Sequence, residues 1–181
     1  MEATVAELSK VGYEGLSIDA VAQVAGVNKT TVYRRWPTKE DLVFFSVEHA
    51  KADFKCPDTG SVREDLVAFM TTVRDFMITN QGRCFFKLLF ERACDPELLK
   101  RFRTMRESAN DPARVIVARG VQRGDLPPSL DPHLLLLALM GSLKHLVIFE
   151  GEPMPREKIE EIVDMVLYGA TRFPNSGVRL A

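Results

Sequence analysis

Basic and hydroxyl side chains are concentrated between residues 28 and 39. This segment contains four bases, Lys29, Arg34, Arg35 and Lys39, and no acid, so its formal charge is +4. The whole chain has a formal net charge of -1, so all the other residues together carry -5. Bases and hydroxyls in one short segment can bind phosphate oxygens and base edges together. We therefore predict nucleic-acid binding through a local patch, because the overall charge offers no general attraction.

The helices that would position this patch can be read from their boundary residues. A first helix over residues 2–11 should end at Gly12, and Gly26 should permit a sharp turn between a second and a third helix. Ser17 and Asn28 have the right side chains to cap the starts of these two helices. The second helix is expected to direct Ile18, Val21, Ala22 and Val24 inward, and the third to run to Arg35. Two short helices joined by a tight turn form a helix-turn-helix.

A fourth helix should follow directly. Pro37 stops the third helix, and Thr38 with Asp41 forms a capping box for a helix that reaches about residue 53. Val27, Val32 and Trp36 are expected to lock the third helix onto the second, with Trp36 in the core. The exposed start of the fourth helix could hold a phosphate beside Lys39. The predicted DNA-binding residues are Ser17, Asn28, Lys29, Thr30, Thr31, Tyr33, Arg34, Arg35 and Lys39; the alternative for each is a solvated surface residue.

The rest of the chain is also predicted to be helical. Turn residues at 56–60 mark a boundary between a helix-turn-helix domain with its linking helix (residues 1–55) and a helical domain for ligand binding and dimerisation (residues 56–181). A capping box at Ser61 and Glu64 opens a fifth helix, which Gln81 and Gly82 should break. The expected later helices cover residues 83–93, residues 96–122 with a kink or interruption at Pro112, residues 131–150, and residues 155–169. The predicted fold class is all-α.

Two of these helices suggest a homodimer. Residues 134–149 are apolar nearly all round, so more than the protein's own core must cover them. Residues 155–169 have a single apolar stripe. An apolar small molecule could bind among the aromatic and sulfur side chains of the same domain, although each of these is also an ordinary core residue. The candidates are Phe69, Met70, Phe76, Phe86, Phe90, Met105, Met140 and His145, the last of which could instead be a core or interface histidine.

Other chemistry finds little support in the sequence. There is no nucleophile motif, phosphate-binding loop or metal-ligand spacing, so we predict no catalytic residue, metal or cofactor. The three cysteines, Cys56, Cys84 and Cys94, form no CxxC pair, which favours a reducing compartment such as the cytoplasm. The apolar run at residues 134–149 contains Lys144 and His145 and is expected to be too short to span a membrane.

Residues 12–42 resemble the signature of the tetracycline-repressor-like (TetR) family. The matching features are a Gly-Tyr turn, Ser-Ile-Asp, an Ala-Gly-Val turn, a Thr-x-Tyr recognition helix, and Trp-Pro-Thr-Lys-Glu-Asp-Leu at 36–42. The resemblance implies a homodimer that binds a palindromic operator and a C-terminal domain whose ligand releases the DNA. Glu7 stands where the family usually has an apolar residue, so a shorter or less firmly packed first helix is expected.

Three functions follow as hypotheses. The first is a ligand-responsive transcriptional regulator, most simply a repressor that a mostly apolar small molecule releases from DNA. The second is a dimeric ligand-binding or scaffold protein that has lost DNA binding. The third is a helical hydrolase. Salt-dependent DNA binding separates the first from the second, and a pocket residue essential for activity would identify the third.

Overall fold

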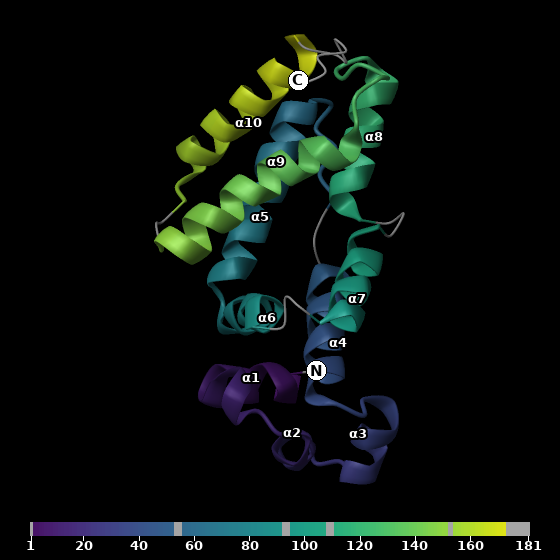
Figure 1. The fold of residues 1–181 in the computed structure, drawn as a ribbon, viewed down its shortest axis with the longest axis vertical. Coiled ribbons are helices and arrows are strands. Elements are labelled where there is room, and N and C mark those ends of the chain that lie inside the picture. The colour runs from purple at the N-terminus through teal and green to yellow at the C-terminus, as the bar shows by residue number, and fades with distance from the viewer. Residues whose placement is uncertain (1, 53–55, 92–94, 108–110, 152–153, 173–181) are drawn as a thin grey trace. The chain divides into compact units, whose positions relative to one another are not determined.

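The computed structural model describes residues 2–52, 56–91, 95–107, 111–151 and 154–172. Within these ranges every regular element is a helix, which confirms the all-α prediction (Figure 1). The helices are α1 (Glu2–Gly15), α2 (Ile18–Val24), α3 (Lys29–Arg35), α4 (Lys39–Ala52), α5 (Val62–Ile78), α6 (Asn80–Glu91), α7 (Pro96–Glu107), α8 (Pro112–Arg123), α9 (Pro132–Lys144), the π-helix η1 (His145–Glu150) and α10 (Arg156–Arg172).

The chain forms two compact units. The first contains residues 1–53 and 76–106, and the second contains residues 54–75 and 107–181. The first unit therefore includes α6 and most of α7 in addition to α1–α4. The division into domains 1–55 and 56–181 stays a prediction.

Side-chain caps begin several of the helices where the sequence predicted them. Ser17 Oγ accepts a hydrogen bond from the Ala20 amide at 3.1 Å, and Asn28 Oδ1 accepts one from the Thr30 amide at 2.9 Å. At α4 the capping box is reciprocal, because Thr38 Oγ1 accepts from the Asp41 amide and Asp41 Oδ2 accepts from the Thr38 amide. Each cap satisfies a backbone group that the helix start leaves unpaired.

The single helix predicted for residues 96–122 is two helices, α7 and α8. Asp111 is the N-cap of α8, with its side chain accepting from the Ala113 amide, and Pro112 is its first helical residue. Proline is well suited to that position because its missing N–H has no partner at a helix start. Pro112 thus interrupts the helix by starting a new one, as Pro132 does after Asp131.

The prediction that Gln81 and Gly82 break a helix is wrong, because both lie in the first turn of α6. Thr79 caps this helix, since its Oγ1 accepts from the Gly82 amide at 3.0 Å. A Cβ atom at position 82 would lie 2.1 Å from the Phe76 carbonyl oxygen, so only glycine fits this corner. Gln81 Nε2 donates to the Ser46 carbonyl at 2.8 Å and fastens α6 to α4.

Helix α1 is kinked at Gly12, the residue predicted to end the first helix. Gly12 has φ 69° and ψ -176°, a backbone conformation that glycine adopts without strain, and helical structure resumes from there to Gly15. Glu7 is 8% exposed and Leu8 is 1% exposed. The expectation that Glu7 would shorten or loosen the first helix is therefore wrong.

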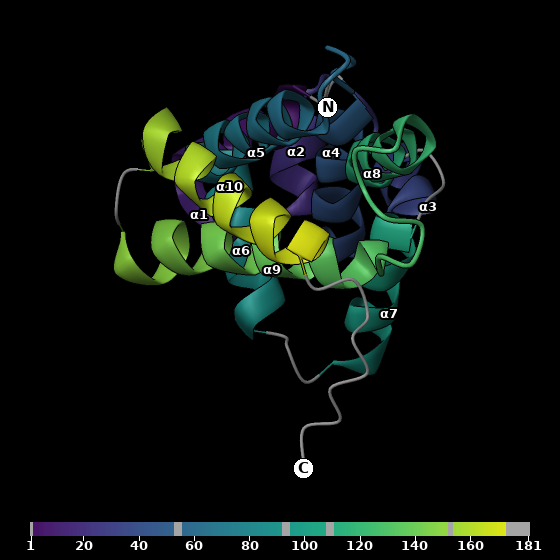
Figure 2. The same cartoon turned by 90° about the horizontal axis from the view of Figure 1, so that it is seen from above.

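In the second unit, α9 and α10 pack against each other (Figure 2). Their buried residues are Leu135, Leu139 and Leu143 on α9, and Ile159 and Val163 on α10. The stretch Pro132–Glu150 is long and apolar enough, by length and composition alone, to cross a membrane, with a mean hydropathy of 1.6 in its most apolar window. This helical stretch extends beyond the predicted run of residues 134–149 at both ends.

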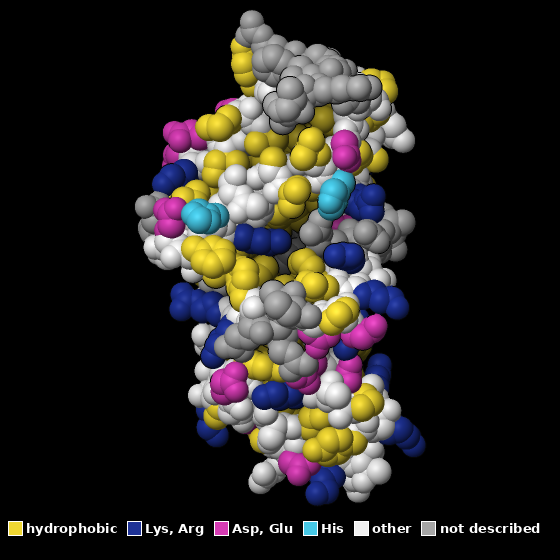
Figure 3. All heavy atoms as spheres, viewed as in Figure 1, with side chains coloured by type: hydrophobic (Ala, Val, Ile, Leu, Met, Phe, Trp, Pro, Cys, Tyr) yellow, Lys and Arg dark blue, Asp and Glu magenta, His cyan; other side chains and the backbone are white. Residues whose placement is uncertain are grey.

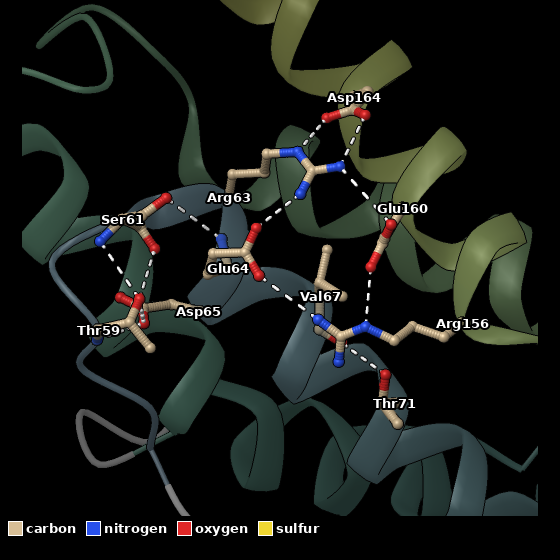
Figure 4. A network of polar contacts seen from close by, with 10 residues as sticks. All are labelled: Thr59, Ser61, Arg63, Glu64, Asp65, Val67, Thr71, Arg156, Glu160 and Asp164. Atoms are coloured by element: carbon tan, nitrogen blue, oxygen red, sulfur yellow. Dashed lines mark hydrogen bonds and ion pairs between the residues drawn. The ribbon is translucent and has the colours of Figure 1, made fainter.

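A network of ion pairs attaches α10 to α5 (Figure 4). Arg63 donates from Nε to Asp164 Oδ1 at 2.6 Å and from Nη2 to Asp164 Oδ2 at 2.9 Å. These hydrogen bonds lower the pKa of Asp164 and outweigh the opposing effect of burial. Arg156 donates to Glu160 at 2.8 Å and lies 3.4 Å from Glu64. Exposed pairs of this kind contribute little singly, and their value here is the orientation of α10.

Candidate nucleic-acid interface

Helix α3 has one buried side chain, Val32. Val32 packs where α3 meets α2, whose buried residues are Ile18, Val21 and Ala22. Val24 was expected to point inward but is 53% exposed. It follows Ile18 by six residues, which at about 100° per residue turns it well away from the buried face. Val27, expected to lock the two helices, is also exposed.

The outward face of α3 presents the predicted DNA-binding side chains to solvent. Lys29, Thr30, Thr31, Tyr33 and Arg34 are all exposed. The ammonium of Lys29 lies 3.7 Å from Asp19, an exposed pair that salt readily screens. The patch can therefore offer ammonium, guanidinium and hydroxyl donors to one surface.

Ser17 and Asn28 cap helices, in addition to any contact that they make with DNA. Their oxygens accept from backbone amides at the starts of α2 and α3. The Ser17 hydroxyl proton and the Asn28 amide protons remain available as donors. Loss of either side chain would therefore destabilise a helix start, whatever else it does.

Lys39 is placed differently from the expectation of an exposed lysine at a helix start. Its Nζ lies 4.3 Å from the centre of the Tyr13 ring and 3.4 Å from the Tyr13 carbonyl oxygen. Tyr13 in turn donates its hydroxyl to Glu40 Oε1 at 2.7 Å. Lys39 and Glu40 thus attach the start of α4 to α1. A phosphate contact by Lys39 stays a prediction.

The start of α4 is also attached to α7. Arg101 donates to Asp41 Oδ1 at 2.5 Å, and its guanidinium lies 4.8 Å from the centre of the Phe44 ring. Burial alone would raise the pKa of Asp41, but hydrogen bonds from Thr38 and Arg101 outweigh it, and the pKa is lowered. Sequence reasoning missed Arg101, because nothing near it in the chain indicates which carboxylate it meets.

Arg35, the last residue of α3, lies against two aromatic rings. Its guanidinium carbon is 5.0 Å from the Trp36 ring centre and 5.3 Å from that of Phe45. The two rings are 4.9 Å apart and tilted by 47°. Trp36 is half-buried, and it packs on α4 through Phe45. Phe45 had no signal in the sequence beyond its place in an apolar run.

The predicted ligand-binding residues are distributed over both units. Phe69 and Met70 are buried in the second unit, where Met140 is half-buried and His145 is exposed. Phe86 is buried in the first unit, where Phe76 is half-buried and Phe90 is exposed. The side chain of Met105 lies outside the described residues, as does Cys94. His145 Nε2 lies 3.1 Å from Glu150 Oε1, and its ring faces Phe149.

The second unit has an exposed apolar face on α9, η1 and α10. Hydrophobic side chains gather over the region where α9 runs (Figure 3). Along α9 and η1 the exposed positions recur at helical spacing. The large exposed apolar residues of this face are Leu134, Leu137, Phe149, Met165 and Tyr168. Gly141 lies in the same row, and a Cβ atom there would meet nothing within 4 Å.

A helix-turn-helix with an exposed basic second helix, attached to a helical body, defines a DNA-binding protein of the helix-turn-helix class. Comparison with known proteins gives the family. Residues 1–44 match the model of bacterial regulatory proteins of the tetR family, and residues 56–166 match that of the tetracyclin repressor-like C-terminal domain. The chain belongs to the TetR family of transcriptional regulators.

Individual relatives agree with this assignment. The HTH-type transcriptional regulator AqdR of Rhodococcus erythropolis is 31% identical over 170 residues, which cover 93% of this chain and 82% of AqdR. The DNA-binding transcriptional repressor TetR of Mycobacteroides abscessus is 29% identical, over 88% of this chain and 85% of that protein. Both similarities extend through the two matched regions, so the chain resembles whole regulators.

Solved structures agree as well. The TetR family transcription regulator SCO0332 superimposes with a TM-score of 0.79 at 29% identity, over 92% of this chain and 93% of that one. FadR of Bacillus subtilis, solved in complex with stearoyl-CoA, superimposes with a TM-score of 0.66 at 18% identity, over 98% and 97%. The second likeness shows the fold alone. The predicted family, fold class and function as a DNA-binding transcriptional regulator are confirmed.

Proposed function

We propose that this regulator is a homodimeric repressor that leaves a palindromic operator when a mostly apolar small molecule binds. The observation that carries the DNA-binding part is the outward face of α3, where Lys29, Thr30, Thr31, Tyr33 and Arg34 are exposed together. A repressor is favoured because a relative from Mycobacteroides abscessus is named one. The alternative is a dimeric ligand-binding protein that has lost DNA binding.

The exposed apolar face of α9, η1 and α10 supports the homodimer. Only 17% of the most apolar window of Pro132–Glu150 is buried inside the protomer. An apolar face of this kind is covered by a partner far more often than left in water. Glycine inside a helix costs about 0.5–1 kcal/mol relative to alanine, and among the described residues nothing lies within 4 Å of a Cβ atom built at Gly141 to require it there. Close approach of a partner helix would supply that reason.

Burial of the aromatic and sulfur residues supports the ligand proposal. Phe69 and Met70 lie in the apolar interior of the second unit, and Met140 is half-buried there. A pocket among such side chains would prefer an apolar molecule. The exposed position of His145 on the apolar face favours the interface interpretation of that residue. We also propose a cytoplasmic location, where operator DNA and the effector would both be found.

Effector and operator are linked through the protein's two conformations. A small molecule can release DNA only if it binds the DNA-incompetent conformation more tightly than the DNA-bound one. The dimer should place its two α3 helices in successive major grooves, about 34–36 Å apart. Its operator should therefore be a palindrome with one half-site for each protomer.

The test is selection of bound duplexes from random-sequence DNA, followed by release assays with candidate apolar molecules. A palindromic consensus bound with a strong dependence on salt is the expected result. Absence of any preferred sequence, together with salt-independent binding, would favour the alternative protein. An effector that does not weaken binding to the selected duplex would contradict the release mechanism.

A further inference from the structure

The guanidinium of Arg35 combines two features that the other described arginines of the first unit do not share. It lies against the rings of Trp36 and Phe45, at 5.0 Å and 5.3 Å from their centres. It has no ion pair with any carboxylate in the part of the chain that the structure describes. Arg101, by contrast, also faces a ring but is neutralised by Asp41.

Contact with aromatic rings orients an arginine without consuming its hydrogen-bond donors. A guanidinium is planar and weakly hydrated, so it stacks on ring faces while its N–H groups point outward from its edge. Those donors form a fork that matches the oxygens of a phosphate. An arginine side chain that two rings already hold in place loses less conformational freedom on binding an anion than an unrestrained arginine loses.

The position of Arg35 in α3 favours a phosphate over a base edge. In a helix-turn-helix the N-terminal residues of the recognition helix reach the bases. Arg35 is the last residue of α3, and Trp36 and Pro37 follow it at once. The end of the recognition helix leaves the groove and passes the sugar-phosphate backbone, where a charge fixed in place sets the docking angle.

We propose that Trp36 and Phe45 form a platform that holds the Arg35 guanidinium in place for a DNA phosphate. Phe45, on α4, is then a positioning residue for DNA binding although it need not touch the nucleic acid. This inference rests on DNA binding by α3. It predicts that Phe45 affects the affinity for DNA only by orienting the charged side chain of Arg35.

The experiment is a salt titration of DNA binding for Arg35→Ala, Phe45→Leu and their combination. The probes are the duplex selected by the wild-type protein and a random-sequence duplex, because a phosphate contact acts on both. Arg35→Ala should lower the slope of log affinity against log salt by about 1. Phe45→Leu should weaken binding about two- to fivefold and leave the slope unchanged, because the charge remains. In the Arg35→Ala background, Phe45→Leu should have no further effect.

Arg34→Ala is the matched control. Arg34 carries the same charge one residue earlier and has no ring contact among the described residues. The effect of Phe45→Leu should therefore persist in full in the Arg34→Ala background. Arg35→Lys, at an exposed site where folding is safe, should keep the slope and weaken binding on both probes. It provides a second measurement if Phe45→Leu lowers the melting temperature.

Two results would overturn the platform while leaving the regulator intact. One is an unchanged salt slope for Arg35→Ala on a wild-type protein that binds DNA normally. The other is an equal effect of Phe45→Leu with and without Arg35, which would mean that Phe45 acts by packing alone. A wild-type protein with no salt-dependent binding would overturn DNA binding itself, and the platform with it.

Discussion

Truncation of Leu137 gives the most direct test of the proposed dimer. Leu137 is 49% exposed in the protomer. Complete burial of a leucine side chain is worth about 1.5–3 kcal/mol, so burial of the exposed half is worth about 0.7–1.5 kcal/mol. A two-fold interface contains this residue twice, so Leu137→Ala should cost about 1.5–3 kcal/mol per dimer. The dissociation constant of the dimer should then rise about 10- to 150-fold.

Leu137→Glu should have a larger effect, because it would place a carboxylate from each protomer in an apolar interface. Sedimentation equilibrium over a series of protein concentrations measures the dissociation constant directly. Circular dichroism on the same samples reports whether the protomer stays folded. A variant that dissociates without losing helix content is the expected result.

Ile78→Ala is the matched control, because Ile78 is 52% exposed and lies outside the apolar face of α9, η1 and α10. It should leave the dissociation constant unchanged. If Leu137→Ala and Leu137→Glu behave like this control, α9 does not form the interface. A charge at Leu143 would be a poor test, since Leu143 is fully buried in the protomer and its loss would unfold the chain.

Three further predictions concern the first unit. Lys39→Ala should lower the free energy of unfolding by about 1 kcal/mol, because it removes the cation over the Tyr13 ring. It should also reduce the slope of log DNA affinity against log salt by about 1. Lower stability with an unchanged slope would mean that Lys39 attaches α4 to α1 and does not contact a phosphate. The pKa of Asp41 is lowered in the folded protein, so its stabilising effect is complete above the unfolded value of about 3.9 and is lost as pH falls through the lower folded value. Urea unfolding should therefore show Asp41→Asn less stable than the wild type by about 1 kcal/mol near neutral pH, with the difference shrinking in acid; a difference that stayed constant at low pH would refute this. Lys29→Ala should cost about 1–3 kcal/mol on the selected duplex and relax base preference there, whereas an equal loss on random DNA in a competition assay would place Lys29 on the backbone.

Features that depend on neighbouring residues could be predicted from the sequence. Ser17, Asn28 and the pair Thr38 and Asp41 cap their helices as expected, because a cap joins atoms that are two or three residues apart. The exposed basic face of α3 follows from the same local information. The interruption at Pro112 was predicted, but Asp111 was not recognised as the cap of a new helix, although Asp111–Pro112 carries the same signal as Asp131–Pro132.

Contacts between distant residues could not be predicted in this way. Lys39 meets Tyr13 across 26 residues of chain, and Arg101 meets Asp41 across 60. From the sequence, Lys39 or Arg101 could equally have bound a phosphate. Only the packing of α1, α4 and α7 determines which partner each base meets. The site residues proposed for DNA and for the ligand stay predictions until binding is measured.

Burial of Val32, and of no other side chain of α3, bears on how such a regulator changes during evolution. Every other side chain of the helix is exposed, and substitutions at exposed positions usually alter stability by less than about 0.5 kcal/mol. Operator preference can therefore drift, residue by residue, with the fold left almost untouched. A duplicated copy of the gene could acquire a new DNA target by changing this one face, with the second unit unchanged.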